Sequence, residues 1–389
     1  TILNNVFCNG DTIPTISFTT NNTDGTTTYT WTNNKPTIGI GGSGNGDIPS
    51  FTAINTGTTP IVATITVTPS FTSTNSCSGT PIPFTITINP SAQVNTIPNK
   101  TVCNNGTQTA INFGTTNTGG TTTYTWTNDT TSIGLGATGN GNIAAFTATN
   151  TGTSPITANI VVTPSYTNNG ISCSGATKTF TITANPSAQV NANANQILCN
   201  GTSTNAVTFS TNNTGGTTTY TWSNSNTAIG LPATGSGNIN VFNVTNSTAS
   251  PISATITVTP SFANGTPACS GLTQSFTITV NPSPIVSFST TNQTICSGDT
   301  SALVTLSSTT SGATFSWTAV QPAGITTVAT SGLGTIPAQT LTNTTNAPIT
   351  ITYAAVATTN DASVCQGSTY NYTITVKPRP SITESFADS

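Results

Sequence analysis

Hydrophobic and polar residues alternate over short stretches of this chain, and threonine fills many of the polar positions. In "PIVATITVTPSF" (60–71), Ile61, Ala63, Ile65 and Val67 fall on one face and threonines on the other. The stretch "FTITIN" (84–89) alternates in the same way. A period of two residues predicts β-strands with one buried face. Clusters of Asn, Thr, Gly and Asp separate these stretches and predict turns.

One strand pattern recurs at a constant interval. "TTTYTWTN" occurs at 26–33 and 121–128, "TTTYTWSN" at 217–224, and the divergent "GATFSWTA" at 312–319. The tryptophans of these stretches are 95, 96 and 95 residues apart: Trp31, Trp126, Trp222 and Trp317. A period near 96 residues exceeds that of solenoid repeats and suits an independent β-sandwich of about 100 residues. We expect these tryptophans to pack between the sheets of each sandwich.

The repeat predicts four tandem immunoglobulin-like (PKD-like) β-sandwich domains, an all-β chain that forms an elongated rod. Seven strands are expected in each repeat, carried in order by "SAQV", "ISFTT", "TYTWT", "TIGI", "FTAIN", "IVATITVTP" and "FTITIN" or their equivalents. No stretch predicts a helix. The expected boundaries are repeat 1 at 1–88, repeat 2 at 89–184, repeat 3 at 185–280, the divergent repeat 4 at 281–376, and a C-terminal tail at 377–389.

The shared motifs of the repeats resemble a known family. The run "CNGT", "TYTWTN", "IGL", "FTATNTGT", "VTPSYTN", "CSG" and "FTIT" is similar to the PKD-like, Ig-like repeats of large surface proteins in Bacteroidota. These include gliding-motility adhesins and other type IX-secreted proteins. The resemblance covers the whole chain and is weakest in repeat 4. It implies an extracellular stalk or adhesive fibre, and it names no ligand.

Composition excludes several classes of function. Only 5 of the 389 residues are Lys or Arg and 8 are Asp or Glu, with no His, and the net charge is −3. Such a chain has no basic surface for nucleic acid and no polybasic membrane patch. No apolar run approaches the length of a membrane span. No secretory signal opens the sequence, although regular cysteines and scarce lysine suggest an extracellular protein whose signal and anchor lie outside this segment.

Eight cysteines form two interleaved series. The first series opens the repeats (Cys8, Cys103, Cys199, Cys296), and the second follows at a constant interval (Cys77, Cys173, Cys269, Cys365). An even count at constant spacing predicts disulfides. We favour pairs within each repeat, worth about 4 kcal/mol each in the chain-entropy model.

A geometric argument leaves a different pairing of the cysteines open as an alternative. In an immunoglobulin topology the two cysteines of one repeat fall at opposite poles, too far apart for a disulfide. The first cysteine of one repeat then meets the second of the next. The pairs become Cys8–Cys173, Cys103–Cys269 and Cys199–Cys365, which leaves Cys77 and Cys296 to neighbouring chains.

Each later repeat begins with a strand-like segment of the type "NPSAQV", which repeat 1 lacks. The tail "KPRPSITESFADS" aligns with this segment, so its Pro380, Ile382 and Phe386 are candidate assembly residues. Either the chain is cut from a longer array, or the tail of one copy completes the first domain of the next, as in donor-strand fibres. The expected partners are therefore copies of the chain or flanking domains of the same giant chain, with surface glycans as a further candidate.

No catalytic or cofactor site is expected. Without His there is no Ser–His or Cys–His pair, and there is no CxxC metal motif. The nearest pair of acids, Asp24 and Asp47, does not recur in the other repeats and is typical of solvated turns. Thr12 and Thr130, in "DTI" and "DTT", match an O-glycosylation pattern of Bacteroidota. The threonine rows suit exposed strand faces, with an ice-binding surface as a minor alternative.

Three functions are consistent with the sequence. The chain is a structural part of an extracellular filament or cell-surface stalk, an adhesion module that binds through exposed loops, or a spacer beside an enzyme domain. The similarity of repeats 1 to 3 favours the structural function, because a ligand site usually sets one repeat apart. An aromatic patch exposed on repeat 4 alone would favour adhesion.

Overall fold

The computed structural model describes residues 3–360, 363–382 and 384. Contacts between residues divide the chain into two compact units. Unit 1 is Thr1–Ser187 with Asn213–Thr217 and Phe262–Cys269, and unit 2 is Ala188–Asn212, Thr218–Ser261 and Ser270–Ser389. The repeat numbering of the sequence is kept below, and every contact described lies inside one unit.

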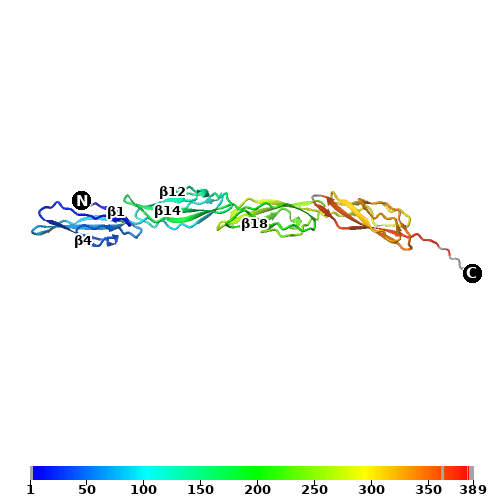
Figure 1. Cartoon of the computed structure of the whole chain (residues 1–389), viewed down its shortest axis with the longest axis horizontal. Helices are drawn as coiled ribbons and strands as arrows, with labels where there is room; N and C mark the ends of the chain where they lie inside the picture. Colours follow the sequence, from blue (N-terminus) through cyan, green and yellow to red (C-terminus); the bar gives the residue numbers. More distant parts are fainter. Residues whose placement is uncertain (1–2, 361–362, 383, 385–389) are drawn as a thin grey trace. The chain divides into compact units, whose positions relative to one another are not determined.

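Repeat 1 contains eight strands and one turn of 3-10 helix. They are β1 (Asn5–Cys8), β2 (Thr12–Ile13), β3 (Thr26–Asn33), η1 (Pro36–Ile38), β4 (Ser43–Asn45), β5 (Phe51–Thr52), β6 (Ile61–Thr72), β7 (Ser76–Ser78) and β8 (Ile82–Asn89). Repeat 2 has the same succession (Figure 1): β9 (Lys100–Cys103), β10 (Thr107–Gln108), β11 (Thr121–Asn128), η2 (Thr131–Ile133), β12 (Thr138–Asn140), β13 (Phe146–Thr147), β14 (Ile156–Asn168), β15 (Ile171–Ser174) and β16 (Lys178–Asn185). The shared succession means that one description of the fold serves both repeats.

Repeats 3 and 4 follow the same plan with small changes. Repeat 3 has β17 (Gln196–Cys199), β18 (Thr217–Asn224), η3 (Thr227–Ile229), β19 (Thr234–Ser236), β20 (Ile252–Ala263), β21 (Cys269–Ser270) and β22 (Gln274–Asn281). Repeat 4 has β23 (Ser287–Phe288), β24 (Gln293–Cys296), β25 (Val304–Ser307), β26 (Thr314–Ala319), β27 (Ile325–Thr326), β28 (Ser331–Leu333), β29 (Thr335–Ile336), β30 (Thr342–Asn343), β31 (Ile349–Asn360), β32 (Val364–Gln366) and β33 (Tyr370–Lys377). The extra short strands set repeat 4 apart.

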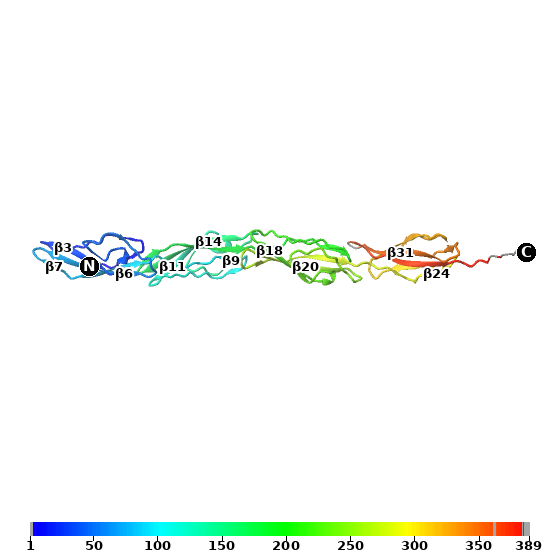
Figure 2. The same ribbon diagram turned by 90° about the horizontal axis from the view of Figure 1, so that it is seen from below.

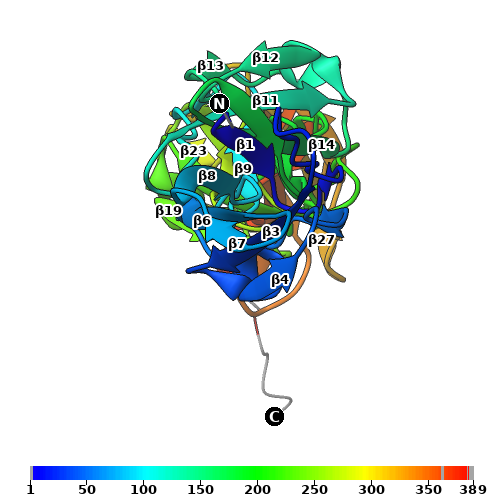
Figure 3. The ribbon, with the colours of Figure 1, turned by 90° about the vertical axis from the view of Figure 1, so that its left-hand side faces the viewer.

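Each repeat is built on one large sheet. In repeat 1 the strand order is β1-β8-β6-β3-β4, with β7 beside β6 (Figure 3). The long strands are antiparallel, whereas β1 runs parallel to β8, with Cys8 opposite Asn89. The second layer is thinner and consists of the β2–β5 pair and a bridge between Ile16 and Ile48. Figure 2 labels β9, β11 and β14, which are the strands of repeat 2 that correspond to β1, β3 and β6 of the large sheet in repeat 1.

A separate hydrophobic core fills each repeat, because the alternating residues of the large sheet face the second layer. The strands that carry the repeated tryptophans place Trp31, Trp126, Trp222 and Trp317 in these four cores. A glycine on the neighbouring strand lies against each indole ring; in repeat 1 it is Gly44, whose missing side chain leaves the room that the ring needs. The prediction of tandem all-β sandwich domains is therefore confirmed.

Three of the expected strands are wrong. "ISFTT" (16–20) forms only the isolated bridge between Ile16 and Ile48, and two further segments also lack the expected strand. "TIGI" (37–40) alternates like a strand but lies in and just after the 3-10 helix η1, which ends at Gly39 with φ 107°. "SAQV" (91–94) has no strand in repeat 2, although Ala92 and Val94 are buried. In "TIGI" and "SAQV", the alternation of apolar residues therefore predicted correctly which side chains are buried. The backbones of these two segments do not form the hydrogen bonds of a strand.

Candidate functional site at the joints between repeats

The position of the first cysteine of a repeat follows from the parallel strand that ends there. Cys8 is the last residue of β1 and lies opposite Asn89, at the far end of β8. Cys77 lies in β7, ahead of the first residue of β8, Ile82. The length of β8 places these two ends about 25 Å apart, whereas a disulfide requires Cα atoms within about 7 Å. The four within-repeat pairs that we favoured from the sequence are therefore wrong.

The structure instead joins each repeat to the next by a disulfide. The pairs are Cys8–Cys173, Cys103–Cys269 and Cys199–Cys365, with Cα–Cα distances of 5.4, 5.4 and 5.5 Å. They close loops of 165, 166 and 166 residues, each worth about 5 kcal/mol in the chain-entropy model. These bonds are the ones that the geometric alternative required.

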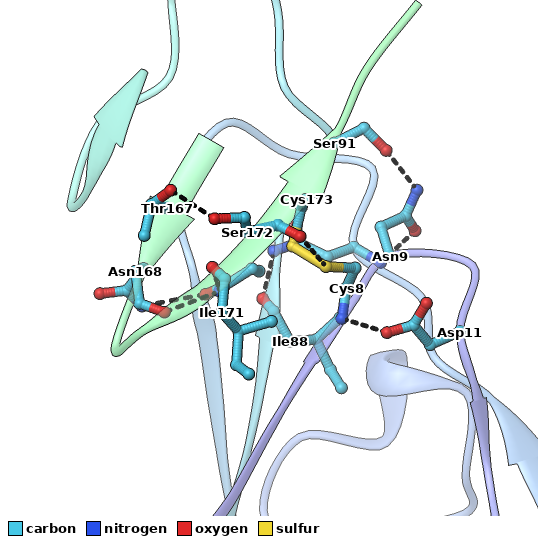
Figure 4. The surroundings of a disulfide bond; sticks show 12 residues. Cys8, Asn9, Asp11, Ile88, Ser91, Thr167, Asn168, Ile171, Ser172 and Cys173 are labelled. Carbon is cyan, nitrogen blue, oxygen red and sulfur yellow. Dashed lines mark hydrogen bonds between the residues drawn. A yellow bond between two sulfur atoms is a disulfide. The ribbon is translucent and has the colours of Figure 1, made fainter. Parts of the chain in front are cut away.

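Buried asparagines lie beside these disulfides. Asn89 donates through Nδ2 to the Asn168 carbonyl at 3.2 Å, and Asn168 donates back to Asn89 Oδ1 at 2.9 Å. Figure 4 shows Asn168 near the disulfide between Cys8 and Cys173. At the next joint Asn185 donates to the Asn264 carbonyl at 3.0 Å. Since Asn89 and Asn185 are fully buried, each lost hydrogen bond would leave a polar group without water. The asparagines therefore fix the direction in which one repeat continues into the next.

A second contact joins the loops of neighbouring repeats. The Thr118 N–H donates to the Thr58 carbonyl at 3.0 Å, and the Thr214 N–H donates to the Thr153 carbonyl at 2.9 Å. A Cβ on Gly119 would lie 2.9 Å from Pro60 Cδ, too close for any other residue without a shift. The turn "NTGG" is thus shaped for the proline loop of the repeat before it.

The segment that leads into each later repeat completes the core of that repeat. We call it the leading segment; in repeat 2 it is "NPSAQV" (89–94). In repeat 2 the leading segment passes Gly175, where a Cβ would overlap the carbonyl oxygen of Ala92. Gly271 and Gly367 have the same relation to Ala188 and Pro284. Two positions further on, a valine enters each core: Val94, Val190 and Val286. The leading segment therefore acts as a plug between the sheet edge and the core.

Together the disulfides and the strands form short covalent paths along the chain. Only the stretch 174–198, which contains β16 and most of β17, separates Cys173 from Cys199. A path from Cys8 to Cys365 thus crosses two disulfides and this one stretch, although nearly the whole sequence lies between the two cysteines. A second path runs from Cys77 along 78–102 to Cys103, across to Cys269 and along 270–295 to Cys296. Once either path is fully extended, further tension acts on its covalent bonds.

Cys77 and Cys296 are the two ends of the second path, and both are free and exposed. Their counterparts behave differently. The counterparts of Cys77 (Cys173, Cys269 and Cys365) are buried in disulfides, and those of Cys296 (Cys8, Cys103 and Cys199) are the other halves of the same bonds. A thiol that solvent can reach therefore stands at each end of this path.

The tail and the candidate glycosylation sites are placed as follows. Pro380 and Ile382 are exposed and follow β33, whereas Phe386 lies outside the described residues. Thr12 is exposed on β2. The Thr130 hydroxyl donates to Asp129 Oδ1 at 2.8 Å. Glycosylation of both threonines stays a prediction.

Two carboxylates are held in their charged form by hydrogen bonds. The side chain and then the backbone N–H of Asn159, followed by the Thr130 hydroxyl, lower the pKa of Asp129 from its ordinary value. The Phe18 backbone N–H, with help from the Ser17 side chain, lowers the pKa of Asp47. Both carboxylates are exposed; Asp129 holds its loop to strand β14, and Asp47 holds its turn to the loop that contains Phe18.

Some features of the wider structure limit the chemistry of the site. Among the described residues, no group of three or more His, Cys, Asp or Glu side chains is placed to hold a metal ion. The helices of the described part are all too short to cross a bilayer.

Sequence reasoning missed the joint asparagines and glycines. "TINP", "TANP" and "TVNP" repeat the asparagines, but Asn before Pro is also an ordinary turn signal.

Comparison with known proteins gives a partial match. Residues 293–380 match the model of the PKD-like domain family. Similar solved structures include the human desmocollin-1 ectodomain (12% identity, 97% of this chain and 80% of that chain, TM-score 0.31). Drosophila N-cadherin EC1-4 (11%, 97% and 99%, 0.29) and titin domains I67-I69 (10%, 74% and 97%, 0.38) are others. No curated protein matches. Repeat 4 is thus similar to PKD-like domains, and the chain as a whole is a tandem array of all-β domains.

Proposed function

We propose that this chain is a tension-bearing segment of an extracellular filament or cell-surface stalk. The observation that carries the proposal is the disulfide pattern, in which each of the three bonds joins one repeat to the next. A disulfide within a repeat would protect only that repeat, whereas a bond between repeats limits the length of the array. The very low charge, with 5 basic and 8 acidic side chains, makes such a structure insensitive to salt.

The proposed setting is the outer surface of a bacterium. Three disulfides are typical of proteins from oxidising compartments. The resemblance of the repeats to secreted surface proteins of Bacteroidota, together with the PKD-like match of repeat 4, supports export by the type IX route.

An adhesion module is the alternative, and repeat 4 is the place to look for it. Among the described residues, the large hydrophobic side chains that are exposed there are aliphatic, including Val320 and Leu333. An exposed aromatic platform, which the adhesive function would favour, is not among them. The structural function is therefore the one that the geometry supports best.

Stretching single molecules tests the proposal. Under oxidising conditions the distance from Cys8 to Cys365 should reach at most about 100 Å, because only two disulfides and the stretch 173–199 span it. After reduction the same two points should separate by more than about 1,000 Å, because the whole stretch 8–365 then extends. Equal lengths in the two states would show that the disulfides carry no tension, and the proposal would fall.

A further inference from the structure

We propose that the tail of one copy plugs repeat 1 of a second copy, and that Cys296 of the first then forms a disulfide with Cys77 of the second. The inference rests on the proposed function, whose filament needs a joint between copies. It is carried by a comparison between repeat 1 and the later repeats, which serve as internal controls.

Among the described residues, the face of repeat 1 that would receive the plug is partly exposed. Positions that the plug and the preceding repeat cover elsewhere are partly exposed in repeat 1: Ile16, Phe18, Pro69, Phe71 and Cys77. Their counterparts in repeat 2 are all buried: Ile111, Phe113, Pro164, Tyr166 and Cys173. These residues leave apolar surface exposed, and one of them, Pro69, lies against Gly79, the counterpart of Gly175. Such a surface on a sheet edge favours a partner that covers it.

The tail carries the residues that this face requires. "KPRPSI" (377–382) aligns with "NPSAQV" (89–94), so Pro380 corresponds to Ala92 and Ile382 to Val94. Val94 is 6% exposed in its core, whereas Ile382 is 96% exposed. Pro284 already occupies the same place in repeat 4, so proline is compatible with it. The expected joint places the Pro380 carbonyl over Gly79 and Ile382 beside Phe18.

The start of the tail is held in the direction that the joint needs. Arg379 donates through Nε to the Ser297 carbonyl at 2.5 Å and forms an ion pair with Asp299 at 2.8 Å. In the segments that follow repeats 1 and 2, the residue at the position of Arg379 is a serine. Each serine accepts a hydrogen bond from the asparagine that follows the first cysteine of the repeat, as Ser91 does from Asn9 at 3.0 Å. The tail therefore leaves repeat 4 against the residue next to Cys296, as the other leading segments do beside their cysteines.

One contact of the internal joints differs at this joint. Asp24 stands where repeat 2 has Gly119, with a similar φ of 62°. Because a Cβ at Gly119 would crowd Pro60 of the preceding repeat, Asp24 of the second copy is expected to crowd the proline loop in repeat 4 of the first copy. Asp24→Gly should therefore speed the assembly.

The covalent step is a balanced thiol–disulfide exchange. A low-molecular-weight disulfide accepts two electrons from the Cys77 and Cys296 thiols and leaves as two thiols, taking up both protons, while the new S–S bond forms. This bond would extend the second covalent path, from Cys77 to Cys296, across successive copies. Copies would then be joined as the repeats within a copy are.

A mixing experiment with the full chain tests the inference. Cys77→Ser and Cys296→Ser chains are incubated separately and together with glutathione disulfide, and the products are followed on non-reducing gels and by peptide mass spectrometry. The mixture should give one dimer linked Cys77–Cys296, and each variant alone should stay monomeric. Homotypic dimers only, or no dimer in the mixture, would overturn the inference.

Variants of the plug separate specific docking from random oxidation. Ile382→Asp should slow dimer formation at least tenfold, since it removes the apolar burial of one large side chain. Leu333→Asp, at another exposed site on repeat 4, should leave the rate unchanged; equal rates for the two would refute the plug. A chain that resists stretching but never dimerises would refute this inference and leave the proposed function standing. A chain that extends fully while oxidised would refute the proposed function itself.

Discussion

The two covalent paths predict that the three disulfides contribute unequally to the length of the chain. With all three present, the shortest path from Cys8 to Cys365 contains only the stretch 173–199 and uses only the first and third bonds. The second bond, Cys103–Cys269, is not on this path. Removing the second bond should therefore leave the maximum extension unchanged, although it closes as long a loop as the others.

Removing the third bond should have a large effect. Without Cys199–Cys365 the shortest path returns from Cys173 to Cys103, crosses to Cys269 and continues to Cys365. It then contains the stretches 103–173 and 269–365 in place of 173–199. Since each added residue extends by about 3.3–3.6 Å, the maximum extension should increase by about 500 Å.

Force spectroscopy on four chains measures this difference. Cys77 and Cys296 are replaced by Ser in all of them to prevent links between molecules. The chains are the parent, the double Cys103→Ser/Cys269→Ser variant, the double Cys199→Ser/Cys365→Ser variant, and the parent after reduction. Handles at both termini are the same in each chain, so the folded length and the handles cancel in the differences.

The expected order of maximum extension is the parent equal to the second-bond variant, then the third-bond variant, then the reduced parent. The reduced parent should exceed the oxidised parent by about 1,150 Å, because the stretches 8–173 and 199–365 also become extensible. An increase of several hundred ångströms in the second-bond variant would refute the path reasoning, since it would mean that the native pairs differ from those in the structure.

Three further predictions concern stability. Gly175→Ala should destabilise repeat 2 by about 2 kcal/mol or more because the new methyl overlaps the leading segment, while Gly136→Ala, with its nearest neighbour at 3.9 Å, should change little in calorimetry. Asn150→Ala should cost about 2–4 kcal/mol in denaturant unfolding, because its side chain makes three hydrogen bonds to backbone groups while almost fully buried; an effect near zero would contradict this. Because the folded pKa of Asp129 lies below its ordinary value of 3.8, its contribution is fully present above that pH and is lost as the pH falls through the lowered pKa. Melting temperatures should therefore be level from pH 5 to 8, and Asp129→Asn should weaken the fall below pH 4; a fall that is unchanged in this variant would contradict the assignment.

Much of the fold could be predicted because alternation and repetition act together. The strands that carry the repeated tryptophans were predicted because an alternating aromatic pattern that recurs at a constant interval fits a half-buried strand and little else. "TIGI" was misread because Ile38 and Ile40 are both buried, as a strand would bury them, while the left-handed Gly39 turns the backbone out of the sheet. The short parallel strand β1 was missed because four residues give too little pattern to read.

The joint was predicted only in part, and the part that succeeded rested on topology. Spacing alone fits two pairings, since each first cysteine lies at a constant interval from one partner in its own repeat and from another in the next. The polarity of the strands decides between them, because Cys8 lies beside the end of β8 and Cys77 lies before its start. The joint asparagines could not be singled out, since their role depends on burial that only the neighbouring repeat creates.

The same topology explains why the joints suit a structure under tension. Each cysteine of the second series is followed by a long strand, a leading segment and a short parallel strand, and then by the first cysteine of the next repeat. The stretch 173–199 begins at the disulfide that joins repeats 1 and 2 and ends at the disulfide that joins repeats 3 and 4. The first and third disulfides therefore lie on the same path. Two paths result, offset by one repeat, and the loss of any single bond interrupts one while the other remains. Because the second path begins at Cys77 and ends at Cys296, a bond between these two cysteines of successive copies would make it continuous, whereas the first path would depend on the plug at each junction.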